Sequence, residues 1–154
     1  MTDDQADLLP TAGRLSGIDY GEVRIGVAIT DPRQIIASPF ENYTRQGEGR
    51  DAIWFREFIE TESVVGFVVG LPLHLSGDES KKSFEARKFG AWLTKETGLP
   101  VAFCDERYTS VDAEEKMVAA KLTKKRRKAR LDMLAAQIIL KSYLDYHKSR
   151  PPSP

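Results

Sequence analysis

The stretch GIDYGEVRIGVAITD, residues 17–31, places a carboxylate, Asp19, at the end of a short apolar run. A glycine-containing turn follows, and then a second and more apolar run. Two apolar runs joined by a short polar turn are typical of an antiparallel β-hairpin. Because burying an unpaired charge is costly, a carboxylate at the end of a core strand calls for a partner.

The overall composition limits the class of protein. The chain has 154 residues, of which 41% are hydrophobic and 30% charged, which indicates one soluble globular domain. No apolar stretch reaches the roughly 20 residues that span a bilayer. The first residues carry Asp3, Asp4 and Asp7 where a signal peptide would carry positive charge, and the single Cys104 cannot form an internal disulfide. We therefore expect a cytoplasmic protein that makes no membrane contact.

Alternating strand and helix patterns predict an α/β fold. The predicted strands are 14–19, 24–30, 35–38, 63–69 and 101–104, and the predicted helices are 49–62, 82–97, 111–121 and 131–146. Pro39 is expected to stop the third strand, because proline cannot donate to a sheet ladder. Three hairpin-linked strands followed by α–β units predict a three-layer fold with a five-stranded mixed sheet.

The same patterns predict one domain with two tails. Residues 1–13 are expected to be a flexible N-terminal tail, 14–147 the single folded domain, and 148–154, which contain paired prolines, a flexible C-terminal tail.

Acidic side chains stand at three element ends. Asp19 ends the first strand, Asp105 and Glu106 follow the last strand, and Asp132 lies near the start of the final predicted helix. Ligand sites of open α/β sheets lie at the carboxyl ends of the parallel strands. Like charges gathered there repel unless cations lie between them, and Mg²⁺ or Mn²⁺ prefers such oxygen ligands. Two such ions stabilise both the attacking and the departing oxygen when a phosphodiester is cut.

Each acid also has an ordinary structural interpretation. Asp19 could accept backbone hydrogen bonds in the turn that follows it. Asp132 could be a helix N-terminal acid favoured by the helix macrodipole, and Glu106 could pair with Arg107 on the surface. Taken singly, the first two interpretations are the better ones, and only the convergence of the three acids favours a metal site.

A basic segment precedes the final helix. KLTKKRRKAR, residues 121–130, holds seven cationic side chains in ten positions and no acid. These are Lys121, Lys124, Lys125, Arg126, Arg127, Lys128 and Arg130. Such a segment is either a solubilising loop or a surface that contacts the phosphates of a nucleic acid.

Four motifs together resemble those of the YqgF/RuvX family. They are GIDYGEVRIGVAITD around Asp19, the GLP turn in VVGLPLHLSGDES, the acidic pair in DERYTSVDAEE, and the helix LDMLAAQIILKSYLD. The resemblance extends from about Arg14 to about Tyr146. It implies a ribonuclease H-like fold related to Holliday junction resolvases, and a bacterial cytoplasmic protein that matures the 5′ end of pre-16S ribosomal RNA.

The resemblance also implies a set of site residues. Asp19, Glu106 and Asp132 match the acidic triad of the family, which would bind Mg²⁺ or Mn²⁺ in a two-metal site and carry the catalysis. Asp105 is the neighbour that could be confused with Glu106, because strand alternation sends the two to opposite faces. Arg107 and the basic segment would hold the backbone of a precursor rRNA without reading its bases.

Two other functions stay open at this point. The same site could cut branched DNA, as junction resolvases do, and a symmetric dimer rather than a monomer would favour that. The chain could also be a non-catalytic nucleic-acid-binding module. Trp54 and Trp92 are interpreted as packing residues within helices, whereas Tyr20 could line the cleft or stack on a base.

Overall fold

The computed structural model describes residues 9–72, 81–105 and 124–149, and the side chains of the last range from 131 to 146. The strands are β1 (Arg14–Asp19), β2 (Arg24–Thr30), β3 (Ala37–Thr44), β4 (Val64–Leu71) and β5 (Val101–Asp105). The helices are α2 (Glu48–Glu62), α3 (Lys81–Thr97) and α5 (Lys124–Ser149).

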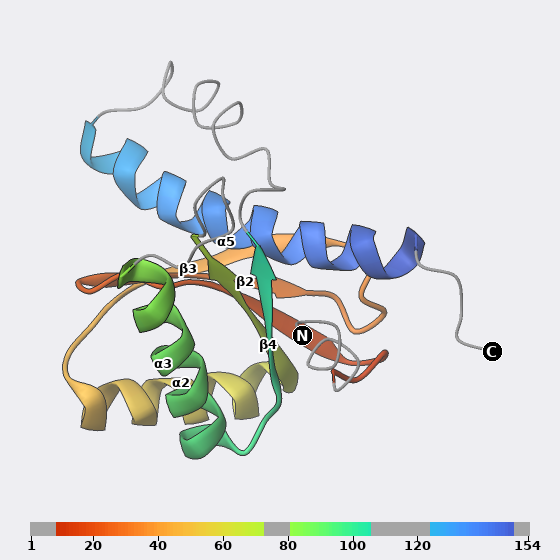
Figure 1. Cartoon of the computed structure of the whole chain (residues 1–154), viewed down its shortest axis with the longest axis horizontal. Coiled ribbons are helices and arrows are strands. Elements are labelled where there is room, and N and C mark those ends of the chain that lie inside the picture. Colours follow the sequence, from red (N-terminus) through yellow and green to blue (C-terminus); the bar gives the residue numbers. More distant parts are fainter. Residues whose placement is uncertain (1–8, 73–80, 106–123, 150–154) are drawn as a thin grey trace.

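The five strands form one mixed sheet in the order β3-β2-β1-β4-β5. The β1–β2 and β2–β3 pairs are antiparallel, whereas β4 runs parallel to both β1 and β5. Helix α5 lies along one face of the sheet, and α2 and α3 lie on the other (Figure 1). The predicted three-layer α/β fold with a five-stranded mixed sheet is confirmed.

The third strand differs from the prediction. It runs from Ala37 to Thr44 and passes through Pro39, which was expected to end it. Because β3 is an edge strand, a residue without a backbone N–H is tolerated there, and the ladder shifts register next to the Pro39 pair. Ile35 and Ile36 belong instead to the loop before β3, where their backbone N–H groups donate to Asp31 Oδ1 over 2.7 and 2.8 Å.

The final helix is longer than predicted. It begins at Lys124 rather than Leu131, so most of the basic segment has helical backbone. Lysine and arginine favour helices, and residues 124–149 hold no glycine or proline that would stop one. Lys121, Glu106, Arg107 and the predicted helix 111–121 lie outside the described residues.

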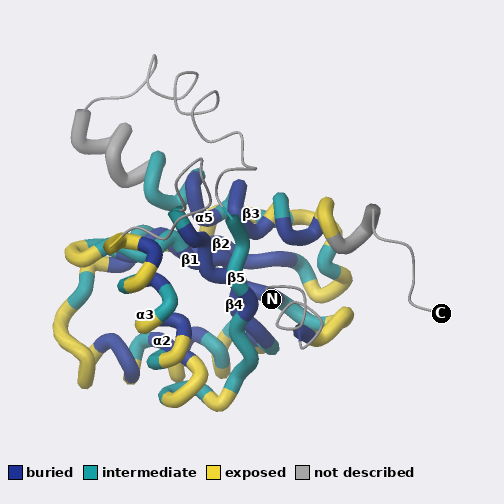
Figure 2. Tube along the Cα trace, in the orientation of Figure 1, coloured by how far each residue is buried: buried dark blue, intermediate teal, exposed yellow. Residues whose placement is uncertain are grey.

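Two apolar cores cover the two faces of the sheet. On one face, Ile18 and Phe67 pack against Phe55 of α2 and Leu93 of α3. On the other face, strand side chains such as those of Leu15 and Val68 pack against α5. The strands β1, β2 and β4 are accordingly the most buried of the described elements, and the outer sides of α2 and α3 are exposed (Figure 2). No helix within the described ranges has the length and apolar character that crossing a membrane requires.

The segment before β1 is attached to the sheet. Leu9 is buried in the core beneath α5, and the Gly13 N–H donates to the Pro32 carbonyl over 2.8 Å. The amide of Gln34 donates to the carbonyls of Pro10 and Gly13, each over 3.0 Å. Residues 9–13 therefore pack against the domain, and the boundaries drawn at 13 and 147 stay predictions.

Two glycines let α5 lie unusually close to the sheet. Gly17 of β1 and Gly26 of β2 both face the helix, and a Cβ added at Gly17 would lie 2.6 Å from the Ala136 carbonyl oxygen. A Cβ added at Gly26 would overlap the carbonyl oxygen of Asp132. Any larger residue at either position would push the helix backbone away from the strands.

We expect Gly26→Ala to lower the free energy of unfolding by about 1–3 kcal/mol, because the added methyl overpacks a contact made by rigid backbone. Urea unfolding monitored by circular dichroism measures the loss. Gly49→Ala is the matched control: nothing lies within 4 Å of a Cβ there, and alanine favours the α2 helix. An equal loss in both variants would contradict the close approach.

Candidate functional site: an acidic cleft at the end of β1

The contact at Gly26 brings two of the predicted acids together. Asp19 pairs with Gly26 across the β1–β2 ladder, so both residues lie on the same sheet face. The backbone of Asp132 in α5 sits directly on Gly26. Asp19 and Asp132, which are 113 positions apart in the sequence, therefore line the same cleft.

This acidic cleft has a volume of about 550 Å³. Its described charged residues are four acids, Asp19, Glu22, Glu85 and Asp132, and two cations, Arg24 and Lys82. Acids therefore outnumber cations among these lining residues, and carboxylate oxygens are the donors that hard divalent ions prefer.

Arg24 forms an ion pair with Asp132. Its Nε lies 3.8 Å from Asp132 Oδ2, and both side chains are about one-third exposed. Strand alternation puts Arg24 on the same face as Gly26, two residues further along β2. An ion pair this long and exposed contributes little to stability, so Arg24 can turn to another anion in the cleft.

The third acid is not among the described residues, but its neighbour is. In β5, Val101 and Phe103 pack toward α2 and α3, whereas Ala102 and Cys104 pack toward α5. Alternation therefore puts Asp105 on the α3 face, away from Asp19. Within the described ranges, no three His, Cys, Asp or Glu side chains form a group that could hold a metal ion.

The longer α5 removes the ordinary explanation for Asp132. A helix macrodipole favours acids within the first turn only. Asp132 lies eight residues beyond the helix start at Lys124, so the macrodipole gives no reason for an acid there. The position of Asp132 at the cleft, with its backbone on Gly26, is therefore a better explanation for an acid at this point of the helix.

A buried network fixes the chain just after Asp19. Asp51 is fully buried and accepts hydrogen bonds from the Tyr43 hydroxyl (2.6 Å), Arg45 Nε (3.2 Å) and the Gln46 N–H (2.9 Å). Arg45 Nη1 in turn donates to the Tyr20 hydroxyl over 2.9 Å. Burial, together with the hydrogen bond to Asp51, raises the pKa of Tyr43 to about 12.

Sequence reasoning missed several residues of this region. Arg24 could have been found from the hairpin, because a glycine opposite Asp19 implies a same-face residue two positions away. Asp51 looked like an ordinary acid near the start of α2, and no pattern in the sequence signals that it is buried. Lys82 and Glu85 follow a segment with no regular pattern, so their approach to the cleft depends on tertiary packing.

Comparison with protein families matches residues 13–146 to the model described as "RuvX: Holliday junction resolvase". The chain belongs to the RuvX family. This match covers both Asp19 and Asp132 and every described strand and helix up to Tyr146. The family predicted from the four motifs is confirmed.

Curated RuvX relatives are similar over most of their length. One from Rhodopirellula baltica is 48% identical over 139 residues, which cover 90% of this chain and 80% of the relative. One from Koribacter versatilis is 40% identical over 86% and 87% of the two chains, and one from Rhodobacter capsulatus is 38% identical over 93% and 90%. All three are named "Putative pre-16S rRNA nuclease".

Solved structures with a similar fold include RuvC of Thermus thermophilus. Its complex with a Holliday junction substrate matches with a TM-score of 0.55 at 15% identity, covering 91% of this chain and 99% of that one. A second RuvC structure from the same organism has a TM-score of 0.53 at 13% identity, with the same coverage. The ribonuclease H-like fold predicted for this RuvX protein is confirmed.

The shifted pKa of Tyr43 predicts a pH-dependent stability. Folded Tyr43 keeps its proton between pH 10 and about 12, where tyrosine in the unfolded chain has lost it. The stabilisation is therefore complete below pH 10 and declines as the pH rises toward 12. We expect Tyr43→Phe to cost about 1.5–3 kcal/mol at pH 8, where the hydrogen bond to the charged Asp51 is intact.

Urea unfolding of wild type and Tyr43→Phe at intervals from pH 7 to 11.5 measures the difference in their free energies of unfolding. The gap between wild type and Tyr43→Phe should narrow above pH 10. A gap that widened with pH would have the wrong sign and would contradict a raised pKa. Tyr146→Phe, which changes an exposed tyrosine on α5, is the control.

Proposed function

We propose that this RuvX protein is a metal-dependent nuclease that cuts a phosphodiester bond at the acidic cleft, most directly in 5′-end maturation of pre-16S rRNA. The observation that carries the proposal is the shared cleft of Asp19 and Asp132, which lie on facing elements of the fold. The names of the relatives supply the reaction class and the RNA substrate. A protein of ribosome maturation would act in the cytoplasm.

The donors in the cleft suit Mg²⁺ or Mn²⁺. Carboxylate oxygens are the ligands these ions prefer, and acids outnumber cations among the described residues of the cleft. Asp19, Asp132 and Glu106 would hold the metal. When bound, it would supply Lewis-acid stabilisation of the phosphoryl oxygens and activation of water.

Glu106 rather than Asp105 is the proposed third acid. The support from the structure concerns its neighbour: Asp105, the last residue of β5, is on the α3 face, away from Asp19. Glu106 matches the acidic triad of the family as well.

The cations of the chain would bind the substrate. Arg24 and Lys82 line the cleft and are placed to neutralise the phosphate that is cut. The helical segment 124–130 leads along the backbone to Asp132, and its cations, with Arg107 and Lys121, would contact phosphates on either side.

We expect Asp19→Asn and Asp132→Asn each to abolish manganese binding, and to reduce cleavage by more than about 100-fold, because losing a direct metal ligand exceeds the cost of an outer-shell partner. Calorimetry with Mn²⁺ and cleavage of a labelled pre-16S fragment on the same samples measure both effects. Asp145→Asn, an exposed acid on the same helix as Asp132, is the matched control. Full cleavage in Asp19→Asn would refute the proposed site.

The neighbouring acids Asp105 and Glu106 give a second test. Glu106→Gln should lose cleavage to the same extent as Asp19→Asn, whereas Asp105→Asn should keep at least about one-third of wild-type activity. The same cleavage assay measures both variants, and thermal melting shows whether each is folded. If Asp105→Asn lost activity and Glu106→Gln kept it, Asp105 would be the ligand. Its side chain would then have to lie on the α5 face of the sheet.

Branched DNA is the second candidate substrate, because the family model is described as a Holliday junction resolvase. A four-way DNA junction and the pre-16S fragment compared in one assay distinguish the two substrates. Cleavage of the junction alone, by a dimeric protein, would favour the resolvase.

A further inference from the structure

A second hollow lies beside the acidic cleft. Its volume is about 420 Å³, and it shares Tyr20 and Glu85 with the cleft. The other described residues that line it are Arg45, Glu48, Lys88, Phe89 and Trp92. We call this hollow the ring pocket. Its size falls within the range of sites that hold a small organic ligand and far exceeds the space that one water occupies.

Three aromatic rings form a continuous row along the ring pocket. The rings of Tyr20 and Phe89 have centroids 4.9 Å apart, and Phe89 stacks on Trp92 at 5.4 Å with an interplanar angle of 26°. Phe89 is buried, but Tyr20 and Trp92 are only partly so. Trp54, by contrast, stacks between Tyr43 and Phe58, as a packing residue does.

The charges of the ring pocket differ from those of the cleft. Two cations, Arg45 and Lys88, face two acids, Glu48 and Glu85. A site built for a bare phosphate would show an excess of cations. Rings combined with balanced donors and acceptors are instead typical of a site for a nucleoside, whose base stacks and whose edges form hydrogen bonds.

Arg45 is held ready to bind. Its Nε donates to buried Asp51 and its Nη1 to the Tyr20 hydroxyl, so the guanidinium cannot move freely. Among the described residues it makes two of the five hydrogen bonds that a guanidinium can donate, and its other N–H groups can donate to a ligand. Fixing the side chain beforehand lowers the entropy cost of binding a ligand.

The cleft and the ring pocket are linked along α3. Lys82, Glu85, Phe89 and Trp92 recur at the spacing of one helix face, from the acidic cleft at Lys82 to the ring pocket at Trp92. Ten residues of helix span about 15 Å, which is enough for a short piece of nucleic-acid strand. A strand cut at Asp19 can therefore continue over Tyr20 into the ring pocket.

We propose that the ring pocket binds one unpaired nucleotide of the substrate strand, close to the bond that is cut. The base lies against Trp92, and the sugar-phosphate contacts Arg45 and Lys88. A base within a duplex is already stacked and paired, so this RuvX protein acts on a strand that is single-stranded beside the cut. The inference rests on the proposed nuclease function and narrows its substrate class.

An abasic scan tests the pocket. The probe is a labelled single-stranded RNA that spans the mature 5′ end of 16S rRNA, in which each base near the cut is removed in turn. Binding is measured without divalent metal, so the strand stays intact. Wild type should lose about tenfold in affinity at one or two positions, the scale of one base–aromatic stack, and Trp92→Leu should lose that dependence.

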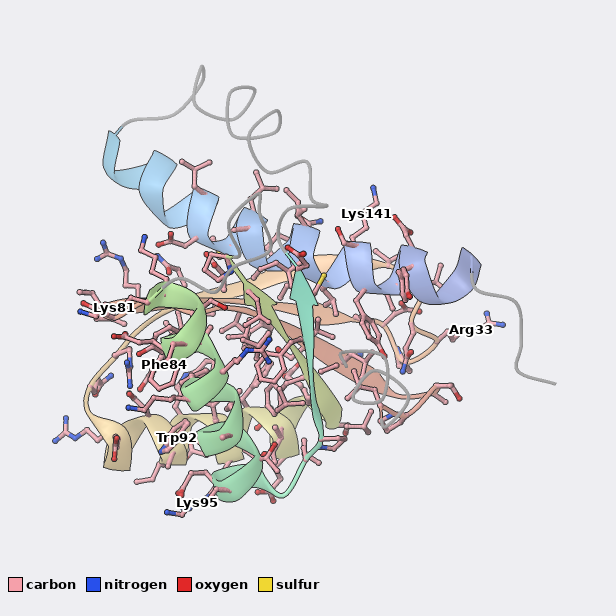
Figure 3. All side chains as sticks on the ribbon, viewed as in Figure 1. Arg33, Lys81, Phe84, Trp92, Lys95 and Lys141 are labelled. Atoms are coloured by element: carbon pink, nitrogen blue, oxygen red, sulfur yellow. The ribbon has the colours of Figure 1, made fainter. Side chains whose placement is uncertain are left out.

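Phe84→Leu is the control, because Phe84 is another aromatic residue of α3 that is 59% exposed and lies outside the ring pocket (Figure 3). Lys88 Nζ lies 5.9 Å from the centre of its ring, so the quantity compared is the abasic penalty and not the overall affinity. It should keep the full abasic penalty. Since Trp92 also packs on Phe89, a second measurement uses wild type alone. 5-Iodouridine at the sensitive position should crosslink to the α3 peptide that contains Trp92.

The outcomes separate the two proposals. An abasic penalty that Trp92→Leu retains, or a crosslink elsewhere, overturns the ring pocket and leaves the nuclease intact. RNA binding with the expected coupling to Trp92, but without cleavage in Mn²⁺, supports the pocket and overturns the nuclease. A protein that binds no RNA overturns the ring pocket and the RNA substrate, and the four-way DNA junction then tests the nuclease.

Discussion

The rest of the site depends on the close contact between the α5 backbone and the glycines of β1 and β2. Gly17 and Gly26 have no side chains, so the helix carbonyls at Ala136 and Asp132 rest on the strands themselves. Gly26 is at the same time the ladder partner of Asp19. One missing Cβ therefore sets the distance between the sheet and the helix and, with it, the approach of Asp132 to Asp19.

The last residue of β1 and the residue after it point to opposite faces of the sheet. Asp19 lies on the α5 face with Gly26, whereas Tyr20 packs toward Phe89 of α3. Strand alternation alone separates the two side chains. Buried Asp51 fixes Arg45, and Arg45 holds Tyr20, so the peptide that carries Asp19 is anchored from the opposite side of the sheet. Such support from rigid elements is what a precise metal or phosphate site requires.

The sequence allowed much of this to be predicted, and the misses have physical causes. Hydrophobic period and turn residues located β1, β2 and β4, because these strands are central and their apolar runs are long. Pro39 misled the assignment of β3, since only the sheet order shows that β3 is an edge. Asp19 and Asp132 were found through element ends and family motifs, but Asp51 and Arg24 act through tertiary contacts that no local pattern records.

The charge distribution shows how a neutral chain would bind both a metal ion and a polyanion. Lysine plus arginine and aspartate plus glutamate number 23 each, so bulk attraction to nucleic acid is absent. Acids are concentrated in the cleft, where they suit a divalent cation, and cations are concentrated in residues 121–130, which lead into α5. A substrate strand would then be attracted to the start of α5 without metal, and only the scissile phosphate would be kept from the carboxylates until metal neutralises them. Metal binding would thereby precede productive binding of the scissile phosphate, because the unneutralised carboxylates repel it.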